Sequence, residues 1–223
     1  MSFYRKIKYF LVHTLNLTNK EASQAIENGW VKINNETITQ NVIIDELSEI
    51  KFNDVIVREK IEFVYLKFYK PIGFQSSLST KVENNLFDFF KNYKGLSIAG
   101  RLDKQSEGLL LLSNDGKWVE KMINPKYIKQ KEYFVELDKE VTKEFILNFS
   151  LGVDIGFYKT LPCICKLINN KTINVVITEG KNKQIRRMCF KLGYNVVNLK
   201  RIRMDSYTLD LMKEGEIAQF KLP

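Results

Sequence analysis

Residues 99–112 read Ala-Gly-Arg-Leu-Asp-Lys-Gln-Ser-Glu-Gly-Leu-Leu-Leu-Leu. The four leucines that end this stretch form a continuous apolar run, which is typical of a strand buried on both faces. Just before that strand, a carboxylate (Asp103) and an arginine (Arg101) stand in a loop flanked by glycines. Loops at the ends of rigid strands commonly present functional groups. By itself, the pattern is equally compatible with an ordinary turn held by a structural pair between Arg101 and Asp103.

Outward from this stretch, extended segments alternate with helical ones between residue 63 and the C-terminal end. Strands are predicted at 63–68, 109–112, 133–137 and 172–177. Helices are predicted near 117–123, after the Asp115-Gly116 turn, and from a cap at Asn182 to about Leu192, with Gly193 as the stop. This order predicts an α+β domain over residues 61–223, built on a mixed sheet that is mostly antiparallel.

The first sixty residues have the pattern of a small helix–helix–hairpin module. Thr18 and Glu21 have the spacing of a capping box at the start of a helix, and Gly29 is placed to end it. Residues 31–33 alternate as a strand before an Asn-Asn turn, and residues 54–57 have the composition of an edge strand. The polar residues 58–62 indicate a linker. We therefore predict two domains, residues 1–60 and 61–223.

The composition fits a folded, cytoplasmic protein, and we take a monomer as the default. Hydrophobic residues make up 44% of the chain, which is enough for a packed core. No run approaches the roughly 20 apolar residues that span a bilayer. The charged N-terminus, Met1 to Lys6, is followed by no apolar segment of the kind a signal peptide needs, so we expect none. No membrane partner is expected.

Three cysteines and one histidine restrict the chemistry. Cys163 and Cys165 lack a second pair at zinc-ligand spacing, so no metal site is predicted and free, mostly buried thiols are expected. The single histidine, His13, gives little basis for a nucleophile–histidine arrangement. Any catalysis should rest on carboxylate, tyrosine, lysine or arginine side chains.

The positive charge is concentrated in the second half of the chain. The formal net charge is +9, yet residues 1–60 contain eight Lys/Arg and eight Asp/Glu and are neutral. The stretch 181–203 holds eight Lys/Arg and no acidic residue. An unbroken basic stretch on ordered elements favours contacts with phosphates, and therefore a nucleic-acid partner. The alternative is a solvated basic face.

Several motifs resemble those of one family. Gly-Arg-Leu-Asp at 100–103 resembles the motif of pseudouridine synthases, in the branch that contains RsuA, RluB, RluE and RluF. The segments at 70–73 (Lys-Pro-Ile-Gly), 131–135 (Lys-Glu-Tyr-Phe-Val) and 179–189 (Glu-Gly-Lys-Asn-Lys-Gln-Ile-Arg-Arg-Met-Cys) resemble the other family motifs in the same order. Residues 193–203 continue the match, so the resemblance spans essentially the whole chain.

The N-terminal module also has a resemblance of its own. The pattern from Glu21 to Asn34 is similar to the alpha-L RNA-binding module, which is shared with a small-subunit ribosomal protein. That module usually opens with Arg-Leu, whereas Arg5, Lys6 and Ile7 stand here, and Lys20 stands where arginines are usual. We therefore expect an RNA grip that is weaker or confined to one face. A module kept only for packing is the alternative.

The resemblance implies an enzyme that isomerises a uridine within structured RNA, without a cofactor. It implies that Asp103 is the nucleophile, which either attacks the sugar or assists formation of a glycal intermediate. Arg186 would keep that carboxylate ionised, because a guanidinium stays charged and pairs bidentately with a carboxylate. Tyr133 would stack on the target base and relay a proton. Without the resemblance, the alternating strand alone favours a core aromatic with a satisfied hydroxyl at Tyr133.

The remaining site residues are assigned by position in the motifs. Arg101 would fill the gap that an extruded uridine leaves, since chemistry on a stacked base requires flipping it out. Lys70 would contact a phosphate or brace Tyr133, and Leu102 and Ile185 would form the pocket wall. Phosphate contacts are expected from Lys183, Arg187, Lys200, Arg201 and Arg203.

Alternatives remain for substrate and activity. The resemblance points to large-subunit rRNA, and small-subunit rRNA or a tRNA are the other candidates; a DNA partner is not expected. A catalytically silent RNA-binding factor for ribosome assembly would lack the nucleophile or the tyrosine, whereas Asp103, Tyr133 and Arg186 are all present. A basic α+β protein unrelated to RNA does not explain four motifs in order.

Overall fold

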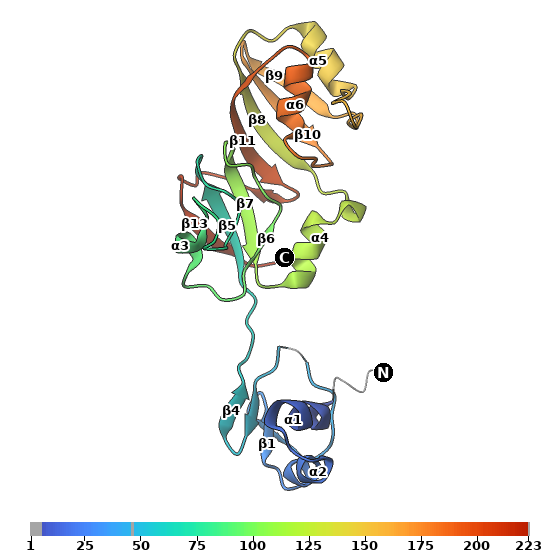
Figure 1. The fold of residues 1–223 in the computed structure, drawn as a ribbon, viewed down its shortest axis with the longest axis vertical. Helices are drawn as coiled ribbons and strands as arrows, with labels where there is room; N and C mark the ends of the chain where they lie inside the picture. Colours follow the sequence, from blue (N-terminus) through green and yellow to red (C-terminus); the bar gives the residue numbers. More distant parts are fainter. Residues whose placement is uncertain (1–5, 46, 223) are drawn as a thin grey trace. The chain divides into compact units, whose positions relative to one another are not determined.

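The computed structural model describes residues 6–45 and 47–222. The chain forms two compact units, Met1–Phe63 and Val64–Pro223, and each is described by itself (Figure 1). The expectations for Met1 to Arg5, namely the missing signal peptide and the arginine of the module's opening, lie outside the described residues. No helix in the described ranges is long and apolar enough to cross a membrane.

The N-terminal unit packs two helices against a small antiparallel sheet. Its capping box at Thr18 and Glu21 is confirmed, and Gly29 follows the second helix with a positive φ of 71°. Described strands pair in the order β2-β1-β3-β4, which makes β4 the predicted edge strand. The elements are α1 (Ile7–Leu15), α2 (Asn19–Glu27), β1 (Val31–Ile33), β2 (Glu36–Ile38), β3 (Ile50–Phe52) and β4 (Val55–Arg58).

The second unit is an α+β domain, as predicted. Its strands are β5 (Tyr65–Lys70), β6 (Ser97–Ala99), β7 (Glu107–Ser113), β8 (Lys131–Leu137), β9 (Ile164–Asn169), β10 (Thr172–Ile177), β11 (Val196–Met204), β12 (Tyr207–Thr208) and β13 (Ile217–Phe220). Its helices are α3 (Phe87–Phe90), α4 (Gly116–Ile123), α5 (Lys143–Ser150) and α6 (Gln184–Lys191), with a 3₁₀ turn at Pro125–Tyr127. Figure 1 shows α5 and α6 together beside the strands β8 to β10.

One mixed sheet organises this unit. Its described strands run in the order β13-β5-β7-β11-β8-β10-β9, with β6 paired to β7 and β12 to β11. Among these pairs only β7 and β11 are parallel. All seven residues of β7 are buried, which confirms the predicted central strand. The parallel joint lies at the start of β7, directly after the Gly-Arg-Leu-Asp loop.

A row of residues crosses this joint in register. Lys70 on β5 pairs with Gly108 on β7, Gly108 with Arg201 on β11, and Arg201 with Tyr133 on β8. Residues directly opposite one another point to the same face of a sheet. We call this the pocket face, defined by Lys70, Arg201 and Tyr133. Its neighbours Leu110, Val135 and Leu199 belong to the largest buried cluster of the unit.

The opposite face, which we call the outer face, carries the residues that alternate with this row. Lys67, Glu132 and Arg203 lie on it. Gly108 is required where the two strands meet: its φ is +104°, and a Cβ there would lie 2.2 Å from the Arg201 carbonyl oxygen. Any side chain at this position would force β7 and β11 apart.

Two details of the sequence prediction need correction. The expected cap at Asn182 is wrong: α6 begins at Gln184, and the residue before it, Lys183, adopts a left-handed conformation with no side-chain cap. The first strand of the unit begins at Tyr65 and not at residue 63.

The three cysteines are free, and Cys165 and Cys189 are buried while Cys163 is partly buried.

Candidate active site

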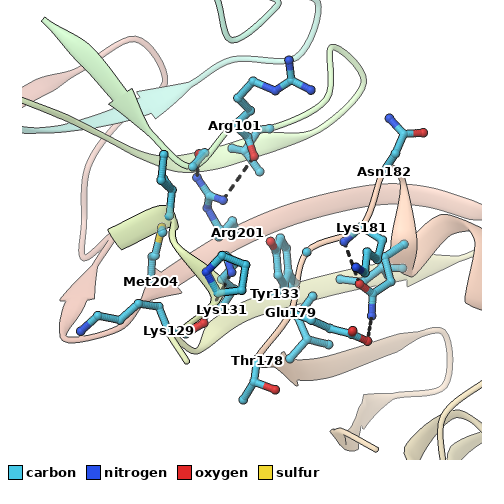
Figure 2. A pocket seen from close by; sticks show the side chains of 18 of the residues that line it. Arg101, Lys129, Lys131, Tyr133, Thr178, Glu179, Lys181, Asn182, Arg201 and Met204 are labelled. Atoms are coloured by element: carbon cyan, nitrogen blue, oxygen red, sulfur yellow. Dashed lines mark hydrogen bonds between the residues drawn. The ribbon is translucent and has the colours of Figure 1, made fainter. Parts of the chain in front are cut away.

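An open pocket of about 910 Å³ lies over the pocket face. The Gly-Arg-Leu-Asp loop forms one side, the beginning of β8 and the end of β11 form the floor, and residues 177–185 form the other side (Figure 2). Asp103 and Tyr133 both line it. Segments that are far apart in the sequence therefore converge on one cavity.

The loop that carries Asp103 is held by an adjacent loop. Ser76 Oγ accepts a hydrogen bond from Leu102 N at 2.9 Å and donates one to Leu102 O at 2.7 Å. The Gly73 amide donates to Lys104 O at 2.8 Å. These bonds link residues 73–76 to the residues on both sides of Asp103. The carboxylate is therefore presented on a braced backbone, as an active site requires.

Arg201 braces the same loop from the sheet, and its expected role as a phosphate contact is wrong. Its side chain is only 1% exposed. The guanidinium donates to Leu109 O at 2.7 Å, Gly100 O at 2.8 Å and Arg101 O at 3.4 Å (Figure 2). Three carbonyl groups thus hold it in place beneath the loop.

Lys70 is also buried, so the expected phosphate contact is wrong here too. Its amine donates to the carbonyls of Pro71 and Phe74, each at 2.8 Å, and does not brace Tyr133. Burial lowers the pKa of Lys70 to about 8, and repulsion from Arg201 adds to this effect. The attraction of Asp103 and of Glu107 opposes this shift in the pKa of Lys70.

Arg186 approaches the Asp103 loop without forming the expected bidentate pair. The guanidinium donates to Gln105 O at 2.8 Å, to Val196 O at 3.1 Å and to Ser106 Oγ at 3.4 Å. It makes no salt bridge with a described carboxylate. Its Nε is buried with no hydrogen-bond partner among the described residues. Burial lowers the pKa of Arg186, and the attraction of Asp103 opposes that shift.

The other predicted pocket residues lie in the cavity lining. Tyr133, Leu102 and Ile185 are 7%, 7% and 4% exposed and all line the pocket. Arg101 is exposed at the rim, and Figure 2 shows its side chain extending away from Arg201. This combination offers a phenol in the floor, apolar walls and an exposed cation at the edge.

The basic residues expected to contact phosphates are divided. Lys183 lines the pocket and is exposed. Arg187 is partly exposed above the Phe157 ring, 4.9 Å from its centroid. Two others lie on the outer face: Lys200 stacks over Tyr69 at 4.7 Å, and Arg203 pairs with Glu132 at 2.6 Å.

A hydrogen-bond cluster at the pocket rim was missed by the sequence reasoning. Glu179 accepts from the Tyr158 hydroxyl, from Leu161 N at 2.9 Å and from Gln184 Nε2 at 2.7 Å. Gln184 in turn accepts from Lys181 N at 3.0 Å. The cluster fixes the start of α6, which carries Ile185 and Arg186. Glu179 opens the third motif, so its position in the sequence was the available signal.

Lys131 was also missed. It lines the pocket two residues before Tyr133 on the same strand. Because side chains alternate along a strand, Lys131 and Tyr133 point to the same face. This alternation was readable from the Lys-Glu-Tyr motif itself. The pocket therefore holds a carboxylate, a phenol and several cations, which suits a planar base attached to an anionic backbone.

Comparison with known proteins agrees with this geometry. The family model described as RNA pseudouridylate synthase matches residues 64–191. The dual-specificity RNA pseudouridine synthase RluF of Escherichia coli is 34% identical over 201 residues, which cover 89% of this chain and 69% of RluF. The ribosomal large subunit pseudouridine synthase B of Bacillus subtilis is 33% identical over 205 residues, covering 88% of this chain and 84% of that protein.

Two further similarities extend over nearly the whole chain. The ribosomal small subunit pseudouridine synthase A of Haemophilus influenzae is 31% identical over 217 residues, covering 95% of this chain and 94% of that protein. A crystal structure of a pseudouridylate synthase superimposes with a TM-score of 0.67 and 30% identity, covering 97% of this chain and 96% of that one.

Proposed function

The chain belongs to the RNA pseudouridine synthase family, and we propose that it isomerises one uridine of large-subunit rRNA with Asp103 as the nucleophile. The observation that carries this proposal is the shared pocket of Asp103 and Tyr133, closed by a braced loop on one side and the start of α6 on the other. The similarity to the large-subunit enzyme of Bacillus subtilis supports the substrate class.

In this proposal each pocket side chain has a defined task. The target uridine is flipped out of the RNA and stacks on the Tyr133 ring between the apolar walls of Leu102 and Ile185. Asp103 acts at carbon 1′ of the ribose while the uracil detaches, rotates and rejoins through carbon 5. Lys70 and Arg186 supply positive charge next to the loop that carries Asp103. Arg101 enters the gap left in the RNA.

The surrounding basic residues hold the RNA. Lys183 and Arg187, at the start of α6, are the exposed candidates for phosphate contacts. We also propose that the N-terminal unit acts as an alpha-L type module. Two of its lysines are engaged within the unit, since Lys32 pairs with Asp54 at 2.5 Å and Lys51 with Glu49 at 3.4 Å. Such pairing supports an RNA grip confined to part of its surface.

The test compares the wild type with Asp103→Asn on unmodified large-subunit and small-subunit rRNA transcripts. Pseudouridine is mapped by chemical labelling and primer extension, and RNA affinity is measured in parallel. We expect a single new site in the large-subunit transcript with the wild type. The variant should form at least about 10³-fold less product, because the nucleophile is lost, while its affinity changes less than about threefold.

The other outcomes discriminate among the alternatives. Wild-type activity in Asp103→Asn would remove the nucleophile assignment. A site found only in the small-subunit transcript would move the substrate to the class of the Haemophilus influenzae relative, whose 31% identity is nearly as high. Binding to both transcripts with no product from either would favour an assembly factor that binds RNA without modifying it.

A further inference from the structure

Lys131 occupies a defined place in the pocket. It opens β8 and faces the cavity together with Tyr133, about 7 Å further along the strand. Its strand neighbours in register are Ile177 on β10 and Met204 on β11, which also line the pocket. The position is therefore fixed on three adjacent strands. A nucleotide whose base stacks on Tyr133 would place its backbone within reach of this side chain.

The ammonium group of Lys131 has few partners. Its one recorded hydrogen bond is a long contact of 3.5 Å to Lys129 O, and among described residues it forms no salt bridge. A lysine ammonium carries three donors. Neighbouring Lys129, which lines the same pocket, differs because its amine lies 2.7 Å from Asp205. Lys131 thus has donors left for a ligand.

Gly180 is the residue of the opposite loop that lies beside this ammonium. A Cβ built on Gly180 would lie in ordinary van der Waals contact with Lys131 Nζ, at 3.7 Å. Gly180 belongs to the loop that forms the far wall of the pocket. The amine therefore lies under a wall that carries no side chain at this point.

The charge around Lys131 favours an anion. Burial lowers the pKa of Lys131, and repulsion from the buried Arg201 lowers it further, while the attraction of Glu179 opposes these effects. An anion placed beside Lys131 would relieve the repulsion between the two cations. Uracil is neutral, so the phosphodiester is the anionic part of the substrate. A compact ammonium suits a single phosphate oxygen.

We propose that Lys131 binds a phosphate oxygen of the nucleotide that carries the target uridine, an assignment that rests on the function proposed above. The contact would anchor the flipped nucleotide from its backbone while Tyr133 holds its base. Lys131 would thereby position carbon 1′ over Asp103. It would act on the substrate directly, in contrast to Arg201, whose donors are spent on the loop.

The test couples a change in the protein to a change in the RNA. A synthetic hairpin carrying the mapped uridine is prepared with a neutral methylphosphonate at the phosphate on its 5′ side or on its 3′ side. Single-turnover rate and affinity are measured for the wild type and for Lys131→Met. With the wild type, one of the two methylphosphonates should lower the rate or the affinity by about 10- to 100-fold. With Lys131→Met, the same methylphosphonate should change that quantity by less than about threefold, because the contact is already lost.

Matched variants separate this role from a structural one. Lys131→Arg should restore most of the rate, because it restores the charge. Lys129→Met removes the neighbouring amine but keeps the carbonyl that Lys131 contacts, and it should respond to the methylphosphonate as the wild type does. The proposal would be overturned if each methylphosphonate lowered the rate and affinity of the wild type and of Lys131→Met by the same factor.

A salt titration keeps this result distinct from a failure of the proposed function. With the large-subunit transcript, Lys131→Met should lower the slope of log affinity against log salt by about one, and an unchanged slope would also overturn the assignment. That readout needs no catalysis. A wild type that modifies neither rRNA would instead count against the proposed function, whatever the slope shows.

Discussion

The two faces of the central strands differ in how they hold positive charge. On the outer face, Lys67 bonds to Asp210 at 2.5 Å and Arg203 bonds to Glu132 at 2.6 Å, while a third cation, Lys200, lies over the Tyr69 ring. On the pocket face, Lys70, Arg201 and Lys131 form no salt bridge among the described residues. The first two donate to backbone carbonyls, which gives them hydrogen-bond partners without a salt bridge to a carboxylate.

This difference teaches where the protein tolerates an energetic cost. Burying a charge without a counterion is unfavourable, and replacing such groups by apolar ones often stabilises a fold. Paired charges on the outer face avoid that cost. The unpaired ones gather where an ionised aspartate and an RNA backbone are proposed to meet. Their positive field attracts a carboxylate and phosphates alike. The energetic cost of burying unpaired cations on the pocket face is therefore consistent with function.

Arg201→Met should cause the largest effect of the substitutions that test this comparison. It removes the donors from three carbonyl groups around the Asp103 loop. Losing them should lower the free energy of unfolding by about 2–4 kcal/mol, since the relief of a buried charge offsets part of the loss. The displaced loop should lower the rate of pseudouridine formation on the order of 10²-fold.

Denaturant titration and single-turnover kinetics check this prediction. Arg201→Lys serves as its control, because it keeps the charge but cannot reach all three acceptors; its rate should stay well below that of the wild type. Wild-type stability and rate in Arg201→Met would show that the loop is held without this side chain.

Lys70→Met tests the charge beneath Asp103 through pH. The pKa of Lys70 is about 8 when folded and 10.5 is its ordinary value, so between these limits the unfolded chain binds more protons. The contribution of Lys70 to the free energy of unfolding therefore rises with pH across this window. Below pH 8 the buried lysine is charged and its destabilising effect is largest. The free energy of unfolding of the wild type minus that of Lys70→Met should increase by on the order of 1–3 kcal/mol from pH 7.5 to 10.5.

Thermal or urea unfolding at several pH values measures this difference. Subtracting the variant cancels other groups that titrate in the same range, including Tyr69, whose pKa is raised by burial and by its bond to Glu107. If the difference in free energy of unfolding between wild type and Lys70→Met did not change from pH 7.5 to 10.5, the buried charge of Lys70 would not destabilise the fold.

The comparison of faces also shows what the sequence could and could not predict. The capping box at Thr18, the buried strand after residue 106 and the alternating strand around Tyr133 follow from local patterns, and the structure reproduces these elements. The roles expected for Asp103 and Tyr133 follow from the family resemblance alone. The roles of Lys70 and Arg201 were wrong because exposure depends on neighbouring strands. Lys70 ends a strand whose burial is decided by the distant β7 and β13.

The basic run at the end of the chain illustrates the physical reason. Simple alternation would place Arg201 and Arg203 on one face, with Lys200 on the other. The pairing of β11 with β8 shifts register between Arg201 and Arg203, so that Arg203 lies opposite Glu132 instead. Such an irregularity depends on two strands whose paired residues Glu132 and Arg203 are 71 positions apart in sequence. Residue type alone cannot reveal it.

Arg203→Met should have the smallest effect and sharpens the distinction between the faces. Its guanidinium is used by Glu132, by Asp205 O at 2.9 Å and by Gln130 at 3.3 Å, so a phosphate would have to displace these partners. The partly exposed ion pair should contribute about 0.5–1 kcal/mol to stability. The rate of pseudouridine formation should stay within about twofold of the wild-type rate. The slope of log RNA affinity against log salt should stay within about 0.3 of the wild-type slope. A slope lowered by about one would show that the outer face also contacts phosphate, and the contrast between paired and unpaired cations would then no longer separate the RNA-binding side from the rest of the sheet.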